Sequence, residues 1–274
     1  MRQRKAKDLD KRLRECSDYI VPLPEDGGRS YGEIGSKDPT FQSPEHEAAL
    51  RQLWKACFPR QRDLYLEIGC GKGDFITRKA AKDPASDFLA IEGQETVILR
   101  ALEKAKGLMS KELPDEAGRE PLQNLKFMLT FVDHMSDYFL ENQLSGVYLN
   151  FSDPWPKARH AKRRLTYHKR LQNYKQVLQT GGFIEFKTDN EALFEFTLEE
   201  IKQCGYPIVE MTRDLHRSAV AEPRHLLTET GGFGCTHPAR HTEVGSYAEK
   251  SRTFLTEYEA KFSAQGKNIN FVRI

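Results

Sequence analysis

From Leu64 onward, short apolar runs alternate with stretches of helical periodicity. The apolar runs read LYLEIG, DFLAIE, LKFMLTFVD, GVYLNF and GFIEFKTD, and the helical stretches lie at about 73–82, 96–109, 167–178 and 190–204. A strand, a helix and another strand in succession make a crossover connection, which joins parallel strands. The alternation therefore predicts an α/β fold with a mostly parallel sheet covered by helices.

The other segments predict an extension and an insertion. Residues 1–60 hold a basic start, a turn-rich piece and one expected helix, Pro44 to Phe58. We therefore expect a basic, partly flexible N-terminal extension ahead of a main domain at 61–274. Residues 219–250 show no sustained periodicity and are rich in Gly, Thr, Pro and His, which predicts an irregular insertion.

Composition excludes several classes of protein. The chain has no apolar run of about 18 residues, and its basic start lacks the apolar segment of a signal peptide, so we expect neither secretion nor a membrane span. Five cysteines at irregular spacing are typical of a reduced, cytoplasmic protein. Since 42 Lys and Arg nearly balance 40 Asp and Glu, affinity for nucleic acid must come from a local cluster. We expect no metal, because no zinc spacing is matched by His216, His225, Cys235, His237 and His241.

The segment LYLEIGCGKGDF places three glycines, Gly69, Gly71 and Gly73, in a turn between a strand and a helix. Such a turn lets backbone approach a ligand closely. The G-x-G-x-G spacing differs from that of dinucleotide-binding turns. Glu67, which precedes the turn, would repel a pyrophosphate but attract the ammonium group of S-adenosylmethionine. Glu92 ends the next strand, where an acid can accept hydrogen bonds from two ribose hydroxyls. The pattern favours a methyl donor, and the alternative is a turn that only packs the helix on the strand.

The segment GVYLNFSDPWP ends the fourth expected strand in a stiff corner. Ligands of open α/β sheets bind beyond the carboxyl ends of the strands, so Asp153 would face the donor methyl group. Pro154 and Pro156 fix two φ angles, and Trp155 offers a flat surface to a base. The alternative for Asp153 is an ordinary capping or turn residue.

A run of cations follows the corner without any acidic residue before Arg170. The run contains Lys157, Arg159, His160, Lys162, Arg163 and Arg164. The alternative is a solvated helix face, but such a face normally carries matching acids. The run therefore predicts a surface that contacts phosphates.

Four motifs of the chain together resemble the tRNA (guanine-N7-)-methyltransferases. They are EIGCGKG at 67–73, NFSDPWPKARHAKRRLT at 150–166, FKTDN at 186–190 and TEYEAKF at 256–262. The likeness covers roughly residues 64–217 and 251–274. The first motif is shared by all class I methyltransferases, whereas the second and fourth are specific to this family. The resemblance implies a Rossmann-like class I methyltransferase with a mostly parallel, seven-stranded sheet and helices on both faces.

The resemblance also implies an activity: transfer of methyl from S-adenosylmethionine to N7 of guanine 46 in the variable loop of tRNA. The sequence leaves open whether the chain is a monomer or a homodimer, and we expect no obligatory protein partner and a basic N-terminus that acts as an RNA-contacting arm. The positions matching the donor site are Glu67, Gly69, Gly71, Glu92 and Asp153, of which Asp153 is the catalytic candidate. The substrate positions are Lys157, Asp189, Thr256 and Glu259, and the RNA positions are Arg159, His160, Lys162, Arg163 and Arg164.

The chain departs from the family after the third strand. Where the family commonly has an acid or amide near the donor adenine, this chain has Phe131, with Asp133 two residues on. Three other functions remain open from the sequence. They are an amino-group methyltransferase for adenine or cytosine, which the SDPWP corner resembles, a non-catalytic RNA-binding protein on the same fold, and a dehydrogenase.

Overall fold

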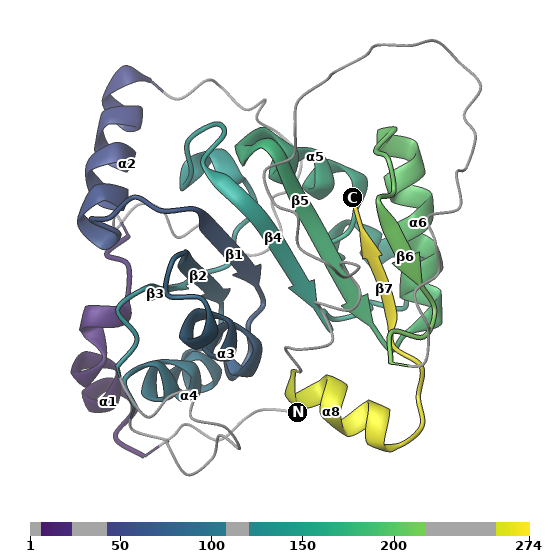
Figure 1. Cartoon of the computed structure of the whole chain (residues 1–274), viewed down its shortest axis with the longest axis horizontal. Coiled ribbons are helices and arrows are strands. Elements are labelled where there is room, and N and C mark those ends of the chain that lie inside the picture. The colour runs from purple at the N-terminus through teal and green to yellow at the C-terminus, as the bar shows by residue number, and fades with distance from the viewer. Residues whose placement is uncertain (1–6, 24–42, 108–120, 217–255) are drawn as a thin grey trace.

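The computed structural model describes residues 7–23, 43–107, 121–216 and 256–274. The insertion expected at about 219–250 lies outside these residues. The described chain forms a seven-stranded sheet flanked by helices (Figure 1). The strands are β1 Leu64–Ile68, β2 Asp87–Glu92, β3 Leu125–Leu129, β4 Leu144–Asn150, β5 Leu178–Thr188, β6 Glu210–Thr212 and β7 Asn270–Arg273.

The strand order is β3-β2-β1-β4-β5-β7-β6. The first five strands in this order are parallel, and β7 runs antiparallel to both β5 and β6. The prediction of a mostly parallel, seven-stranded α/β sheet is therefore confirmed. From β1 the chain builds outward to β2 and β3 on one side, then returns to β4 and β5 on the other. This reversal is the switch point where ligands bind in open α/β folds.

Helices cover both faces of the sheet. On one face lie α2 Pro44–Cys57, α5 His168–Val177 and α6 Glu191–Cys204, whose side chains share a core with Leu64 and Leu66 of β1. On the other lie α1 Leu9–Glu15, α3 Asp74–Lys82 and α4 Glu95–Ala105, packed near Tyr65. Because successive side chains of a strand point to opposite faces, this short strand contributes to both cores. The helix α8, Glu257–Ala264, lies below the arrowheads of β4 and β5 in Figure 1.

The expected helices between the parallel strands are present, with ends shifted by a few residues. The helix expected over Pro44 to Phe58 is α2, and the Ser43 side chain accepts a hydrogen bond from His46 N as its N-cap. The sequence did not predict α1, α8, β6 or β7. The extension thus contains a second helix, α1, where only one was expected.

The described part of the extension packs against the domain. Val21 N donates to Phe127 O of β3 at 2.8 Å, and the guanidinium of Arg12 in α1 is paired with Glu103 of α4. Residues 7–23 are therefore docked along the β3 edge of the sheet. The boundary near residue 60 stays a prediction.

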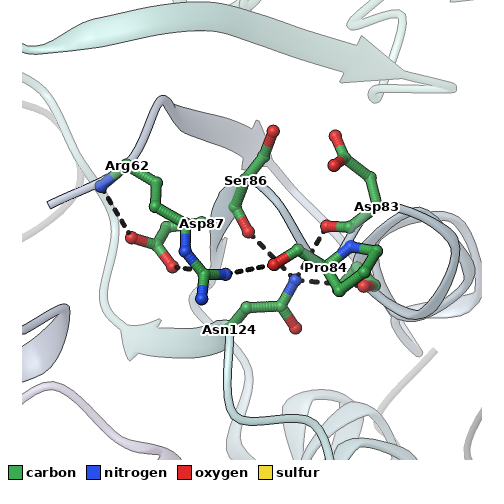
Figure 2. Close-up of polar contacts among 7 residues, drawn as sticks. Arg62, Asp83, Pro84, Ser86, Asp87 and Asn124 are labelled. Atoms are coloured by element: carbon green, nitrogen blue, oxygen red, sulfur yellow. Dashed lines mark hydrogen bonds and ion pairs between the residues drawn. The ribbon is translucent and has the colours of Figure 1, made fainter. Parts of the chain in front are cut away.

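Hydrogen bonds among side chains and loop carbonyls join the strands at their amino ends (Figure 2). The side-chain amide of Asn124 donates to three carbonyls at 3.0 Å each, those of Ala80, Asp83 and Ser86. Arg62 binds Asp87 through its backbone N–H and its guanidinium, which also donates to Pro84 O. These contacts fix the starts of β1, β2 and β3 relative to one another.

Candidate functional site

A cavity of about 570 Å³ opens at the carboxyl ends of β1, β2 and β4. It lies at the switch point of the sheet, where the sequence places the ligand. Its wall includes the five residues predicted for the donor: Glu67, Gly69, Gly71, Glu92 and Asp153. The fold therefore brings the glycine turn, both acids and the Asp-Pro-Trp-Pro corner to one cavity. Asp153 lies at that wall and not in the apolar core.

The glycine turn adopts a left-handed backbone. Gly71 has φ +57° and Gly73 φ +76°, a region that residues with a side chain rarely adopt. A Cβ on Gly73 would also lie 2.5 Å from Cβ of Ala101, so this glycine allows α3 to pack against α4. The turn directs the Gly71 N–H to the carboxylate of Glu92 at 3.2 Å.

Glu92 is held at the mouth of the cavity by backbone donors. One carboxylate oxygen accepts from Gly71 N and the other from Gln94 N at 3.0 Å. Burial raises the pKa of Glu92, these hydrogen bonds oppose the shift, and the negative charge of Asp153 adds to it. The two carboxylates are thus close enough to repel each other across the cavity.

Glu67 is a buried acid with one unsatisfied oxygen. Its Oε1 accepts from Asn150 Nδ2 at 2.8 Å, and its Oε2 has no partner among the described residues. The side chain is 2% exposed. Burial raises its pKa to about 8, and the Asp74 charge adds to the shift, against the opposing effects of the Asn150 hydrogen bond, the Lys187 charge and the Ile76 backbone N–H, whose approach does not meet the geometry of a full hydrogen bond. A buried, unpaired carboxylate oxygen at a cavity wall fits a cationic ligand group.

The Asp-Pro-Trp-Pro corner has a strained backbone. Phe151 and Trp155 have φ values of +50° and +41°, which bulky residues adopt only when their surroundings enforce it. Arg164 supplies part of that enforcement, since its guanidinium donates to Pro154 O and Trp155 O at 3.0 Å each. The Ser152 hydroxyl is buried without a partner among the described residues.

The cationic run leads away from the corner as the 3₁₀ helix η3, Ala158–Arg163. Arg163 lies 4.9 Å above the Trp155 ring, and His160 meets the same ring edge-on at 5.6 Å between centroids. Partial desolvation and the positive charges of the neighbouring arginines and Lys157 lower the pKa of His160. Four cations of the run are exposed: Lys157, Arg159, Lys162 and Arg163. Among the six predicted cations, Arg164 is the one whose guanidinium holds the corner.

The four predicted substrate residues lie in different surroundings. Asp189 and Thr256 line the cavity, whereas Lys157 and Glu259 do not. Glu259 is fully buried, with Oε2 at 3.1 Å from Lys187 Nζ and Oε1 at 3.0 Å from His216 Nε2. It also forms a capping box with Thr256 at the start of α8. The structure therefore places Glu259 where it anchors α8.

Sequence reasoning missed Tyr258, which lines the cavity and is 56% exposed. The Thr-x-x-Glu spacing at 256–259 is the signature of a capping box, and it would have placed this residue in the first turn of a helix. The exposure of its ring toward a cavity has no signal in the sequence.

Phe131 and Asp133, the two residues at the departure from the family, have different roles in the structure. Phe131 lines the cavity and is 45% exposed. Asp133 is paired with Arg170 at 2.9 Å and is absent from the cavity wall of the described structure.

The described residues contain no group of three His, Cys, Asp or Glu side chains arranged to hold a metal. Within the described ranges, no helix combines the length and apolar composition that a membrane crossing requires. Four cysteines in these ranges are free thiols: Cys16, Cys57, Cys70 and Cys204.

Comparisons with known proteins agree with this geometry. A family model described as "Putative methyltransferase" matches residues 61–272. The tRNA (guanine-N(7)-)-methyltransferase of Latilactobacillus sakei is 37% identical over 232 residues, which cover 85% of this chain and 88% of that protein. The enzyme of the same name from Halalkalibacterium halodurans is 39% identical over 187 residues, 67% of this chain and 80% of that one. Among solved structures, "Structure of an Antibiotic Related Methyltransferase" matches 81% of this chain and 92% of its own with a TM-score of 0.50. Its 15% identity supports the fold alone.

Proposed function

Because the chain belongs to the tRNA (guanine-N(7)-)-methyltransferase family, we propose that it transfers the methyl group of S-adenosylmethionine to N7 of a guanine in tRNA. The resemblance assigns this guanine to position 46 of the variable loop. We further propose that the enzyme is cytoplasmic and acts as a monomer or homodimer. The observation that carries the proposal is the unpaired Glu67 oxygen, which shares one cavity with the glycine turn and Asp153.

The residues of the cavity fit the donor. Glu67 would bind its ammonium group, and Glu92 its ribose hydroxyls. The glycine turn leaves room for the donor beside the backbone, since no described atom lies within 4 Å of the point where a Cβ on Gly71 would stand, and its φ of +57° would strain any side chain there. S-adenosylmethionine, when bound, supplies an electrophilic methyl group on a positively charged sulfur.

The acceptor chemistry needs no general base. Guanine N7 carries an in-plane lone pair and no proton at neutral pH, so nothing must be removed before it reacts. The chain must instead hold the two reactants in line, which can contribute about 7–11 kcal/mol to lowering the barrier. The strained corner, held by Arg164, is suited to fix Asp153 for this purpose.

Carboxylates beside the base would stabilise the transition state electrostatically. The purine becomes positively charged as the methyl group arrives, so a nearby carboxylate stabilises the transition state more than the ground state. Asp153 and Asp189, both at the cavity wall, are our candidates for this role. The sequence also suggested Glu259 as a substrate residue. We propose instead that Glu259 stabilises the start of α8.

The exposed cations of the run would hold the phosphates around the target base. Replacing Arg159, Lys162 and Arg163 together with alanine should weaken tRNA binding and reduce the slope of log affinity against log salt by roughly 0.7–0.9 per lost phosphate contact. A matched control replaces three exposed cations elsewhere, Lys55, Arg60 and Lys175. Equal salt slopes for parent and triple variant would mean that the run contacts something else.

The direct test incubates the purified protein with unmodified tRNA and S-adenosylmethionine and identifies the methylated nucleoside. We expect N7-methylguanosine, which makes the RNA chain cleavable by aniline after borohydride reduction. A methylated adenine or cytosine would support the amino-group methyltransferase instead. Binding of tRNA without any methylation would support the non-catalytic alternative.

A further inference from the structure

A buried lysine lies behind the glycine turn. Lys104, in the last turn of α4, is 4% exposed, and a lysine is almost never buried to this extent unless its charge is paired. Its ammonium group donates to Asp74 Oδ1 at 2.8 Å and to Lys72 O at 3.0 Å. Both hydrogen bonds cross from α4 to the segment that joins β1 to α3. The lysine therefore binds the glycine turn.

The two acceptors lie directly before and directly after Gly73, whose φ of +76° bends the turn. Lys104 and Ala101 are three residues apart and so lie on the same face of α4. A Cβ on Gly73 would lie 2.5 Å from the Ala101 Cβ, so the turn approaches this face closely. One face of α4 thus fixes the turn: a small side chain permits the approach, and the ammonium group holds the chain on both sides of the glycine.

Asp74 is a second carboxylate beside the proposed donor site, since it lines the cavity together with Glu67. Burial raises the pKa of Glu67, and the negative charge of Asp74 adds to that shift. Without a cation beside it, Asp74 would compete with Glu67 for the ammonium group of the donor. In the structure Asp74 is paired with Lys104, while Glu67 Oε2 has no partner among the described residues.

We propose that Lys104 is a positioning residue for the methyl donor: it holds the glycine turn and neutralises Asp74, so that the donor ammonium group pairs with Glu67. Lys104 is absent from the cavity wall of the described structure, so it acts through the turn and through Asp74. The assignment rests on the proposed function and adds to it a residue behind the cavity on which donor binding depends. The alternative is that Lys104 only packs α3 on α4.

The preceding residue of α4 provides a matched control. Glu103 is 8% exposed and also forms an ion pair, but its partner is Arg12 of α1. Lys104→Met and Glu103→Gln therefore each remove one buried charge from the same turn of the same helix. Glu103→Gln should leave donor affinity within about twofold of the parent, because its ion pair does not involve the glycine turn.

Lys104→Met should weaken binding of S-adenosylhomocysteine by about 10- to 100-fold in calorimetry, the loss typical when a residue that orients a binding group is removed. The KM for S-adenosylmethionine should rise by a similar factor. The kcat at saturating donor should stay within about threefold of the parent, because the reacting groups are unchanged. A loss that appears mainly in kcat would contradict the assigned role.

Removing the charge of Asp74 as well should restore part of the donor binding. The double variant Lys104→Met, Asp74→Asn has no unpaired carboxylate beside Glu67. Its affinity for S-adenosylhomocysteine should therefore exceed that of Lys104→Met by at least about fivefold, although each substitution removes a polar contact. Such a recovery is not expected if Lys104 only packs the two helices.

The pH dependence of donor binding gives a second readout. Asp74 of α3 and Lys187 of β5 are the charged groups that face Glu67, and burial raises the pKa of the nearby Cys70 thiol, which keeps it neutral. In Lys104→Met the unpaired Asp74 should raise the pKa of Glu67 further. The increase of donor affinity with pH should then occur at higher pH than in the parent, and the double variant should reverse this displacement.

Two results would overturn the proposal. One is parental donor affinity in Lys104→Met, and the other is an equal loss in the single and double variants with the pH dependence of the parent. Thermal unfolding checks that each variant is folded. If Lys104→Met does not fold, Lys104→Gln, which keeps a hydrogen-bond donor and lacks the charge, replaces it with the same expected shift in pH dependence. A parent protein that does not bind the donor would instead refute the proposed function, so the two failures are distinguishable.

Discussion

The two ends of the parallel strands differ in how their polar groups are satisfied. At the amino ends, Asn124 binds three carbonyls, and Ser145 donates to Asp63 at 3.1 Å and accepts from Gln179 at 2.9 Å. At the carboxyl ends, Glu67 Oε2 and the Ser152 hydroxyl are buried without partners among the described residues. The polar groups at the amino ends of the strands thus stabilise the fold, whereas those at the carboxyl ends are available to hydrogen-bond a ligand.

The direction of the helices explains much of this difference. Each crossover helix begins near the carboxyl ends of the strands, where its free N–H groups and positive dipole end suit ligands. It ends near the amino ends, where its last carbonyls need donors. Asn124 supplies such a donor to Ala80 and Asp83 at the end of α3. One end of the sheet therefore requires internal partners, and the other can offer its groups to a ligand.

The largest difference between the roles of the two ends should appear when one carboxylate is removed from each. Asp153→Asn should lower kcat by about 10²- to 10³-fold, because the cationic transition state loses its carboxylate, while tRNA affinity and thermal stability stay near the parent. Asp87→Asn at the amino ends is the matched control, and it should lower the melting temperature without changing kcat per folded molecule. Single-turnover methylation and filter binding measure the first variant. If Asp153→Asn loses tRNA binding as strongly as activity, Asp153 is structural.

A change of pH should affect donor binding through Glu67. Burial raises the pKa of this carboxyl to about 8, so below that pH it must lose a proton before it pairs with the donor ammonium. Donor affinity should therefore increase as the pH rises from roughly pH 6 towards pH 8, by up to about tenfold per unit, and fall again at higher pH as the donor's ammonium group loses its own proton. Calorimetry with S-adenosylhomocysteine measures this dependence, which Glu67→Gln should abolish. An affinity of the parent that does not change over this range would contradict the assigned role.

The amino ends can be tested by stability alone. Asn124→Ala leaves three carbonyls without their donor and should lower the free energy of unfolding by about 1–3 kcal/mol. For a chain of this size, that corresponds to roughly 2–4 °C in melting temperature per kcal/mol. The kcat/KM of the folded variant should equal that of the parent. If the variant has normal stability and impaired methylation, the amino ends of the strands serve activity and not stability, which contradicts the prediction.

The sequence predicted the elements whose signal is local. Alternating apolar and helical segments predicted β1 to β5 and the helices between them, because each such pattern spans enough residues to be unambiguous. The strand β6 has three residues and β7 four, too short for a periodicity, and their pairing depends on contacts between distant parts of the chain.

For the site, motif position predicted which residues line the cavity, but not which way every side chain turns. Glu67, Glu92 and Asp153 were predicted from their places at strand ends, which the fold fixes. Arg164 and its neighbour Arg163 look alike in sequence, yet one binds the carbonyls of the corner and the other lies over Trp155. That choice depends on the left-handed backbone of the corner, which no local pattern reveals.

The smallest expected effects come from two serines at opposite ends of β4, and they should have opposite signs. Ser145→Ala removes a hydroxyl with two partners and should destabilise the protein by about 1 kcal/mol. Ser152→Ala removes a buried hydroxyl that has no partner among the described residues, so it should be neutral or stabilising by up to about 1 kcal/mol. Urea unfolding of both variants measures the difference, and donor-free protein must be used because a ligand could satisfy the Ser152 hydroxyl. Equal destabilisation by the two substitutions would show that the carboxyl end of this strand is as fully satisfied as its amino end.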